Sequence, residues 1–501
     1  MKVSRQHSDQ MEFLTPPLLF NEKDLSAPPA YAGILAFHKY WGKKPYEPLA
    51  YLIERLTDEG NIVLDPFMGS GVSGFAANHL HRKFIGIDLN PVAHKLSSLV
   101  LEPPSRRLLQ HSLKHLETLA KPRIQETYQT GSSHLPISHL LWDEDKLVEV
   151  WANDGRKRKT FEPQTSDYER ASAFDQYVPS FRTPTLFKNS RINASPGLGW
   201  QDFFTGRALQ NIDCLLESID ACEAEARNVL QLCLTASLGQ MSKMVFAITG
   251  RGKTSGEASE KIEVGSWVIG FWRPKVHFEI NVWNCFYQRA QKLVKALPET
   301  GRAATIGSLS DLLERDTDAA LLSGDALSLL EQVPNASVRL ILTDPPHSDR
   351  VPYLELSEIW NAVLNLDVKF EEEVVVSNAN VRGKTHADYT SRMNRFIAIS
   401  ARKLRADGVL AIMFNARTSE SWDFFTSIEE NVSGEILRFQ GCFPLEYSAR
   451  SVVQDNRAGA LKNDFVLLFA FEGNSRRDFR SIPGWSKHYP EGALKEDAVN
   501  V

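Results

Sequence analysis

Long apolar runs, paired cysteines and an excess of positive charge are all missing from this sequence of 501 residues. No stretch of about 18 consecutive apolar residues occurs, so no membrane-spanning helix is expected. The first twenty residues lack the apolar segment that a signal peptide requires. The sequence therefore predicts a cytoplasmic protein that does not contact a membrane.

The five cysteines form no CxxC pair and are typical of a reducing compartment. No metal-ligand set is visible, and a structural zinc site is not expected. The net charge of −5 excludes a polycation, so a nucleic-acid partner would have to meet a local basic face. The cysteines are Cys214, Cys222, Cys233, Cys285 and Cys442.

The first motif with chemical content is LDPFMGSGVSG, residues 64–74, which follows a short apolar strand. Asp65 ends that strand, and Gly69 and Gly71 let the backbone turn close to a group bound at a helix N-terminus. Asp88 ends the next strand, where an acid can accept both hydroxyls of a ribose. The motif alone suits a dinucleotide, a nucleoside, or a turn that only packs a helix on a strand.

The second motif is SGDALSLLEQVPNASVRLILTDPPH, residues 323–347. Asp325 follows a short strand and would lie within reach of a purine amino group. In TDPPH, two prolines fix the backbone, so that Asp344 and the carbonyl of Pro345 can point at one spot. His347 supplies an aromatic face for stacking.

Such a turn suits a planar amine, for example the exocyclic nitrogen of adenine or cytosine. The lone pair of that nitrogen is delocalised into the ring, which makes the nitrogen a poor nucleophile. Hydrogen bonds from its two protons to a carboxylate and a carbonyl favour the form that attacks a methyl donor. A turn that merely ends a strand is the alternative interpretation of this motif taken alone.

Alternating apolar strands and amphipathic helices surround both motifs and predict an α/β fold with a mostly parallel sheet. The expected helices span 45–56, 71–80, 354–366, 389–408 and 419–432. The expected strands span 61–64, 83–89, 338–346, 408–414, 435–443 and 464–472.

The long region between the two motifs must contain structure of its own. Within it the sequence predicts paired helices over 208–224 and 225–239, a strand over 265–272 and a mobile loop over 248–261. The polar start of the chain is expected to form an arm or a loosely docked segment, and the end a disordered or loosely packed tail.

DPFMGSG, GIDLNP and TDPPH together resemble the S-adenosylmethionine-dependent amino-methyltransferases of DNA, the N-4 cytosine and N-6 adenine class. HKYWGKKPYEPLAYLIER and VPYLELSEIW are similar to a bacterial subgroup with KYW-x-x-KP and VPY-x-x-LS motifs. DFFTGRALQNIDCLLESI resembles a helix of the middle region of that subgroup. The resemblance covers residues 33–100 and 320–472, and 195–300 more loosely.

The resemblance assigns roles to individual residues. Asp65, Phe67, Gly69 and Gly71 match the loop around the methionine part of S-adenosyl-L-methionine, Asp88 the ribose acid, and Asp325 the residue near the cofactor adenine. Asp344, Pro345, Pro346 and His347 match the catalytic turn. His347 departs from the family, which usually has tyrosine there, although an imidazole can also stack on a flipped base and donate a hydrogen bond.

The resemblance implies a Rossmann-like methyltransferase sheet with a large inserted domain. The expected divisions are an arm (1–30), a cofactor-binding half (31–100), an insert (101–320), a catalytic half (321–472) and a tail (473–501).

An enzyme that methylates a base in double-stranded DNA must flip the base out, and the insert is the candidate surface for holding the duplex. Within it, residues 153–161 and 251–261 would supply phosphate contacts, or are simply solvated charged loops.

The expected activity is site-specific methylation of DNA, with adenine N-6 favoured over cytosine N-4 because an aspartate opens the catalytic turn. A restriction or defence protein is a candidate partner. The alternatives are methylation of RNA or of a protein glutamine, and a non-catalytic DNA-binding relative. An NAD-dependent oxidoreductase would share the glycine turn, but TDPPH has no place in it.

Two further sets of residues have open roles. His38, Lys39 and Lys43 would either serve the cofactor carboxylate or lie on the surface. The tryptophans of the insert are interpreted as core in preference to stacking platforms for bases; these are Trp200, Trp267, Trp272 and Trp283.

Overall fold

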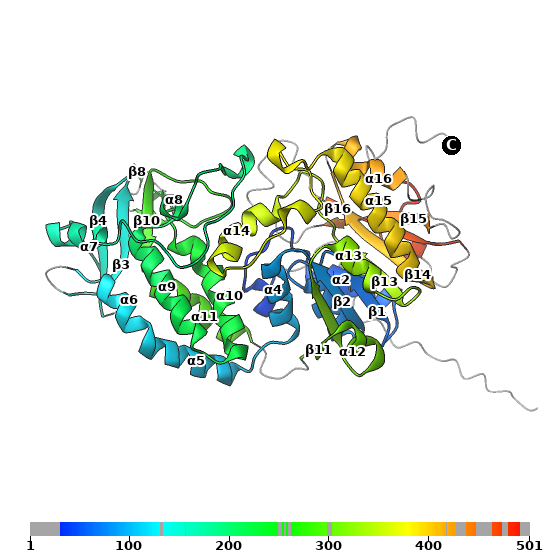
Figure 1. Ribbon diagram of the computed structural model, residues 1–501, viewed down its shortest axis with the longest axis horizontal. Helices are drawn as coiled ribbons and strands as arrows, with labels where there is room; N and C mark the ends of the chain where they lie inside the picture. Colours follow the sequence, from blue (N-terminus) through cyan, green and yellow to red (C-terminus); the bar gives the residue numbers. More distant parts are fainter. Residues whose placement is uncertain are drawn as a thin grey trace, which may run out of the picture.

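A large and a small β-sheet organise the chain, as the computed structural model shows (Figure 1). The structure describes residues 31–130, 134–155, 157–248, 253–254, 257–258, 262–297, 303–416, 418–426, 428, 437–446, 463–472 and 479–490. The predicted arm (1–30) and most of the predicted loop (248–261) lie outside the described residues. Among the helices within these ranges, none is long and apolar enough to cross a membrane.

The large sheet has eight strands in the order β11-β12-β2-β1-β13-β14-β16-β15. From β11 to β14 each strand is parallel to its neighbour, whereas β16 and β15 run antiparallel. The predicted α/β class with a mostly parallel sheet is therefore confirmed. In chain order the strands are β1 (Ile62–Asp65), β2 (Lys83–Asp88), β11 (Ile306–Gly307), β12 (Ala319–Ser323), β13 (Val338–Thr343), β14 (Leu404–Phe414), β15 (Leu437–Glu446) and β16 (Asn463–Phe471).

The strand β1 joins two parts of the chain that are distant in sequence. Val63 lies opposite Phe84 of β2 on one side and Leu340 of β13 on the other. From β1 the chain continues to β2 on one side, and from β13 it continues to β14 on the other. The direction of winding thus reverses between β1 and β13, and such a switch point is where open α/β sheets bind ligands.

Both faces of the sheet are buried, because successive side chains of a strand point to opposite sides. Val63 and Leu340 pack with α2 (Tyr46–Leu56), α3 (Val72–His79) and α4 (Pro91–Leu101). Leu64 and Ile341 pack on the other face, with α13 (Ala326–Gln332), α15 (His386–Lys403) and α16 (Asp423–Thr426). The continuous apolar runs of these strands follow from this double burial.

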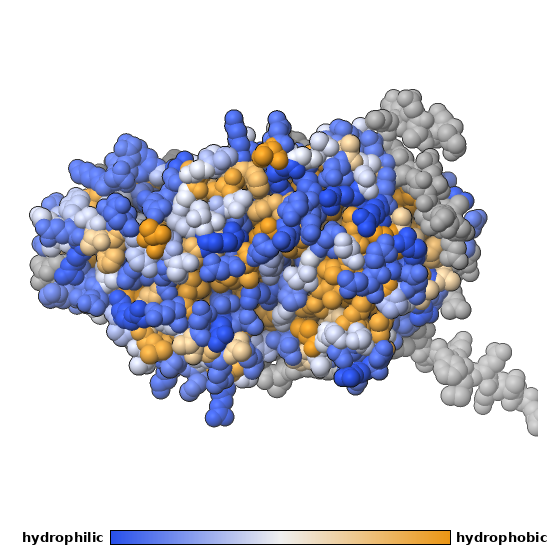
Figure 2. Space-filling model, in the orientation of Figure 1, coloured by the Kyte–Doolittle hydropathy of each residue, from blue (hydrophilic) through white to orange (hydrophobic). Residues whose placement is uncertain are grey.

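The small sheet is antiparallel and lies at the opposite end of the molecule in Figure 1. Its strands are β3 (Ile137–Asp143), β4 (Lys146–Asp154), β5 (Lys157–Phe161) and β10 (Val276–Ile280). Helices α5 (Arg106–Leu119), α6 (Lys121–Thr127), α9 (Gly206–Asp220), α10 (Ala224–Met241) and α11 (Val282–Ala296) lie between the sheets. The predicted helix pair is confirmed as α9 and α10, and their side chains share a core with one face of the large sheet. Figure 2 shows mainly hydrophilic side chains on this face of the molecule, with hydrophobic ones gathered towards the middle.

Three predicted elements are wrong in part. Residues 265–272 form no strand, because Trp267 Nε1 donates to the Gly270 carbonyl and closes a turn. The helix α15 ends at Lys403 and not at Gly408, since Leu404 already pairs with Val338 in the sheet. The helix predicted over 419–432 is only a 3₁₀ turn and the short α16, with most of the remainder outside the described residues.

The tail was expected to be loosely packed, and this is wrong for residues 479–490. Phe479 and Ile482 are buried. Ser486 and Cys442 of β15 exchange backbone hydrogen bonds, and the Tyr489 ring stacks on Phe439. This segment therefore covers the antiparallel edge of the large sheet.

Candidate active site

The turn after β1 is held by the carboxylate of Asp65. Its Oδ1 accepts hydrogen bonds from the Phe67 amide at 3.1 Å and from Thr343 Oγ1 at 2.8 Å, and its Oδ2 accepts from Ser73 Oγ at 2.6 Å. Burial raises the pKa of Asp65 to about 6. Because Thr343 ends β13, Asp65 ties the glycine turn to the strand that precedes Asp344.

Glycine is required in this turn for two reasons. Gly69 and Gly71 have φ values of +53° and +80°, in the left-handed region that favours glycine. A Cβ at Gly71 would lie 2.8 Å from Ser97 Cα, and one at Gly69 would lie 3.1 Å from the Tyr40 ring. The turn therefore presents bare backbone, with Gly71 as the N-cap of α3.

Asp88 ends β2 beside this turn. Its two oxygens accept hydrogen bonds from the backbone amides of Gly69 and Asn90, each at 2.8 Å. Each carboxylate oxygen has a second lone pair, so Asp88 retains capacity for ligand hydroxyls. Burial raises the pKa of Asp88 to about 7.

Asp325 lies at the start of α13 and serves as its N-cap. Its Oδ2 accepts from the Ser328 amide at 3.0 Å and from Ser328 Oγ at 2.6 Å. Its Oδ1 is buried and has no hydrogen-bond partner among the described residues. A buried acceptor without a partner is costly, so this atom suits a donor from a ligand.

A cavity opens at the switch point between β1 and β13. Most of the predicted site residues line it, and Gly71, Pro345 and His347 do not. Those that do are Asp65, Phe67, Gly69, Asp88, Asp325, Asp344 and Pro346. Groups from the two motifs, far apart in sequence, thus face one space.

The turn after β13 directs one carboxylate into this cavity. Asp344 is 15% exposed and lies next to the buried Pro345. The carbonyl of Pro346 accepts a hydrogen bond from Tyr389 Oη at 2.7 Å, and this bond fixes the turn on α15.

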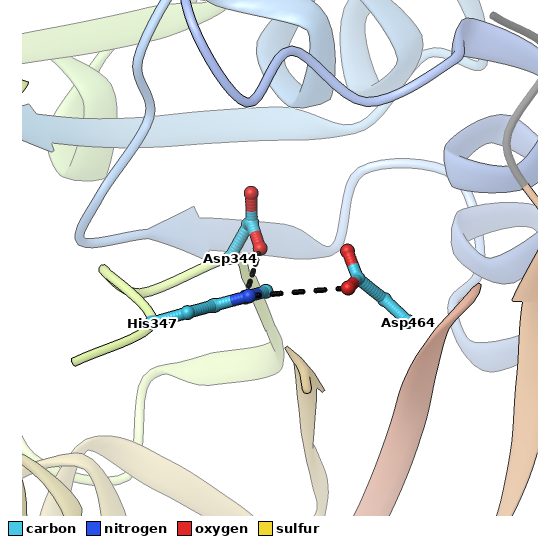
Figure 3. A group of neighbouring side chains, drawn as sticks. All are labelled: Asp344, His347 and Asp464. Atoms are coloured by element: carbon cyan, nitrogen blue, oxygen red, sulfur yellow. Dashed lines mark hydrogen bonds and ion pairs between the residues drawn. The ribbon is translucent and has the colours of Figure 1, made fainter. Parts of the chain in front are cut away.

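His347 does not present a stacking face to the cavity, contrary to the prediction. Its side chain is buried, and its ring packs against Phe414 of β14 with the ring centroids 4.9 Å apart. Nε2 lies 2.8 Å from Asp344 Oδ1, and Nδ1 lies 2.9 Å from a nitrogen of Arg350 (Figure 3 shows the contact with Asp344). The ring faces the protein interior because both of its nitrogens have partners there.

Two charged residues of this site did not emerge from the sequence. Lys44 Nζ lies 2.5 Å from Asp344 Oδ2 and 3.1 Å from Asp464 Oδ2. Lys44 belongs to the GKKP segment, residues 42–45, in which only Lys43 was predicted as a candidate site residue. Asp464 is the second residue of β16, and an acid next to an apolar run carries no recognisable signal in a sequence.

Aromatic rings at the cavity come from segments other than the turn after β13. Tyr40 and Tyr353 both line it, and their rings stack with centroids 6.4 Å apart. Phe67 also lines it and packs edge-on against Phe396. These rings are the aromatic surfaces that a planar ligand would meet there.

His38, Lys39 and Lys43 were predicted either to serve the cofactor carboxylate or to lie on the surface, and the structure places the three differently. His38 Nε2 is hydrogen-bonded to Thr235 Oγ1, and burial lowers the pKa of His38 to about 3. Lys39 Nζ lies over the Trp267 ring at 4.6 Å from the centroid. Of the three, Lys43 alone lines the cavity, although its Nζ donates to the carbonyls of Leu35 and His38.

The tryptophans of the insert mostly lie in the core, as predicted. Trp200 and Trp283 are buried, and Trp267 is partly buried against Trp41. The prediction is wrong for Trp272, which is 51% exposed and has Phe246 as an aromatic neighbour.

The two basic segments have different outcomes. In the first, β5 is an edge strand that exposes Lys157, Arg158 and Lys159, and the Arg158 guanidinium lies over Trp151. Most of the second, 251–261, lies outside the described residues.

The match to a family model covers the cofactor half of the site. Residues 19–98 match the model N6_N4_Mtase, described as DNA methylase. The suspected relationship to the N6/N4 DNA methylase family is therefore confirmed over these residues.

Curated relatives support the same relationship. The chain is 44% identical over 68 residues to the type II methyltransferase M2.DpnII of Streptococcus pneumoniae, covering 13% of this chain and 25% of the relative. It is 48% identical over 144 residues to the type II methyltransferase M.HpaI of Haemophilus parainfluenzae, covering 26% of this chain and 44% of the relative. The chain thus spans less than half of the length of these relatives.

The similarity of the chain to a solved structure is weak. The rRNA methyltransferase aviRa of Streptomyces viridochromogenes aligns with 90% of this chain and 93% of its own, at 11% identity and a TM-score of 0.28. A TM-score this low does not establish a shared fold.

Proposed function

We propose that this protein is a site-specific DNA methyltransferase, which transfers a methyl group from S-adenosyl-L-methionine to the exocyclic amine of a flipped base. One observation carries the proposal: the glycine turn and the Asp344 carboxylate face the same cavity at the switch point of the sheet. Acceptors for a nucleoside and an acceptor for a planar amine are thereby close together. The matches to the DNA methylase model and to type II methyltransferases support the same reaction.

The residues fit a nucleoside cofactor on two counts. The turn at Gly69 and Gly71 has no room for a side chain, so its backbone can lie against a bound group. The unpartnered Oδ1 of Asp325 suits an adenine amino group, and Asp88 suits ribose hydroxyls. When bound, the cofactor supplies an electrophilic methyl group.

The chain's own groups prepare the amine. Asp344 accepts a hydrogen bond from the target N–H, which favours the form of the nitrogen that can attack. Pro345, whose carbonyl was the expected second acceptor, does not line the cavity, so Asp344 is the proposed acceptor of this turn. Tyr40 and Tyr353 offer the aromatic surface that was expected from His347.

A cavity of this kind admits a base only after it has left the duplex. The insert, residues 101–320, is the proposed surface for the surrounding DNA, with the exposed cations of β5 as phosphate contacts. We retain the preference for adenine N-6 over cytosine N-4, because an aspartate opens the turn. A cognate restriction or defence protein is a proposed partner.

The test is transfer of labelled methyl groups to duplex DNA, with mass spectrometry of the hydrolysed bases. Label recovered as 6-methyladenine is the expected result, and 4-methylcytosine alone would overturn the base preference. Label in RNA or in protein glutamine, with none in DNA, would overturn the proposed substrate. Cofactor binding without transfer to any acceptor would favour a DNA-binding relative.

A further inference from the structure

Asp344 belongs to a closed ring of five side chains behind the cavity. His347 Nε2 contacts one oxygen of Asp344 at 2.8 Å, and Lys44 Nζ contacts the other at 2.5 Å. Lys44 also forms an ion pair with Asp464 at 3.1 Å. One nitrogen of Arg350 closes the ring, at 2.9 Å from both Asp464 Oδ1 and His347 Nδ1.

The ring is mostly buried and draws on three separate segments. Lys44 comes from the segment before α2, Asp464 from β16, and the others from the turn after β13. Asp464 is 0% exposed, His347 5% and Lys44 6%, against 15% for Asp344 and 21% for Arg350. Of the five, Asp344 and Lys44 line the cavity.

The partners of His347 define its tautomer. Nε2 faces two acceptors, Asp344 Oδ1 at 2.8 Å and the Met413 carbonyl at 3.2 Å, so this nitrogen carries the proton. Nδ1 faces an Arg350 nitrogen, which can only donate, so Nδ1 is the acceptor. The imidazole is therefore neutral and donates towards Asp344.

Two positively charged side chains of the protein balance the carboxylates of this cluster. Asp344, His347 and Asp464 place three potential metal-ligand atoms within 4.8 Å of one another (Figure 3). The ammonium of Lys44 and the guanidinium of Arg350 already neutralise the two carboxylates. The positive charges of Lys44 and Arg350 hold the pKa of Asp464 below its usual value.

We propose that His347 and Lys44 are positioning residues that fix the orientation of the Asp344 carboxylate through this ring. On this view, the histidine that replaces the usual tyrosine acts through its Nε2–H and not by stacking on the base. One lone pair of each Asp344 oxygen is used by the ring, and one remains for the target amine. The inference rests on the proposed function, since Asp344 is the catalytic residue only in that reaction.

The decisive variants separate hydrogen bonding from aromaticity at position 347. His347→Gln keeps an N–H donor and loses the aromatic ring, and we expect kcat within about threefold of wild type. His347→Phe keeps the ring and loses the donor, and we expect kcat to fall about 30-fold, as misplacement of a reacting group does. Cofactor Kd should stay within about twofold in both, because His347 does not line the cavity.

A matched pair at another histidine controls for general effects. His386→Gln and His386→Phe change a histidine outside the ring and should leave kcat unchanged. Wild-type kcat in His347→Phe, together with loss in His347→Gln, would show stacking and overturn the proposal.

A double-mutant cycle tests whether the ring acts as a unit. Lys44→Met and His347→Phe remove contacts to opposite oxygens of Asp344. If both act by freeing that carboxylate, the double variant should be little worse than either single variant. If the fold-losses in kcat of the two single variants multiply in the double variant, Lys44 and His347 act independently and the proposed ring is contradicted.

One measurement does not depend on methyl transfer. Nitrogen-15 NMR of the labelled full chain should show His347 with Nε2 protonated and Nδ1 unprotonated at neutral pH. Lys44→Met should perturb this resonance, while Asp316→Ala, at an exposed position, should not. A proton on Nδ1 would overturn the proposed ring of hydrogen bonds, even if the enzyme transfers methyl groups. If the spectrum is as expected but no methyl transfer is detected, only the proposed function is refuted.

Discussion

Two neighbouring turns, at the carboxyl ends of β1 and β13, are held in opposite ways. The turn after β1 is held by contacts to backbone amides and by glycines, nearly all from residues 65–97. The turn after β13 is held by charged side chains, with Lys44 and Asp464 brought from distant segments. A site held by contacts between residues close in sequence can be predicted from a motif. A site held by charged side chains from distant segments cannot.

The largest effect expected from this contrast is that of Asp344→Ala. Loss of the hydrogen bond to the target amine should reduce kcat about a hundredfold or more, equivalent to about 3 kcal/mol. Cofactor affinity should remain within a few-fold, because the turn after β1 is untouched. Rate measurements at saturating cofactor give kcat, and calorimetric titration gives the cofactor affinity. An equal loss of kcat and of affinity would refute the assignment of catalysis to one turn and cofactor binding to the other.

Next in size is the effect of a side chain at Gly71. Gly71→Ala forces alanine to φ +80° and places its Cβ 2.8 Å from Ser97 Cα, so we expect a loss of about 2 to 3 kcal/mol in unfolding free energy. Gly60→Ala is the matched control, with φ +74° but nothing within 4 Å, and should cost about 1 kcal/mol. Denaturant unfolding of both variants measures the difference, and equal costs would show that close packing of this turn is unimportant.

The pH dependence of cofactor binding should be smaller. Asp88 has its pKa raised to about 7, and ribose hydroxyls bind best to its ionised form. Binding should therefore release a proton below pH 7, and affinity should fall up to about tenfold for each pH unit below 7. Calorimetry in buffers of different ionisation enthalpy counts that proton, and Asp88→Asn should abolish the dependence.

The smallest effect concerns Asp325. Asp325→Ser keeps a capping oxygen for α13 and removes the unpartnered Oδ1, so unfolding should change by less than about 0.5 kcal/mol. Cofactor affinity should fall by about 1 kcal/mol, the usual value of one hydrogen bond. Unchanged affinity in a titration would place the adenine elsewhere.

Much of the large sheet could be predicted from sequence, since its buried strands are continuous apolar runs next to glycine and proline turns. Asp65, Gly69, Asp88 and Asp344 were found because each is part of a local motif. The orientation of His347 could not be predicted, because it depends on Arg350 and on the Met413 carbonyl of another strand.

The small sheet shows a second limit of prediction. Its strands were missed because β3 and β4 include polar side chains such as His139, Glu149 and Asn153, which weaken any period of two. The strand expected over 265–272 is apolar enough, but Gly270 adopts φ +72° and turns the chain.

The pairing of β1 with β13 also affects how the chain is made. A ribosome completes β1 and β2 long before β12 and β13, which lie on either side of them in the finished sheet. At roughly 5 to 20 residues per second, the intervening chain takes about ten to fifty seconds to synthesise. During that time both edges of the β1–β2 pair stay open, and unpaired apolar strand edges promote aggregation. A nascent chain of this design therefore has to be shielded, by its own insert or by chaperones, before its two turns can meet.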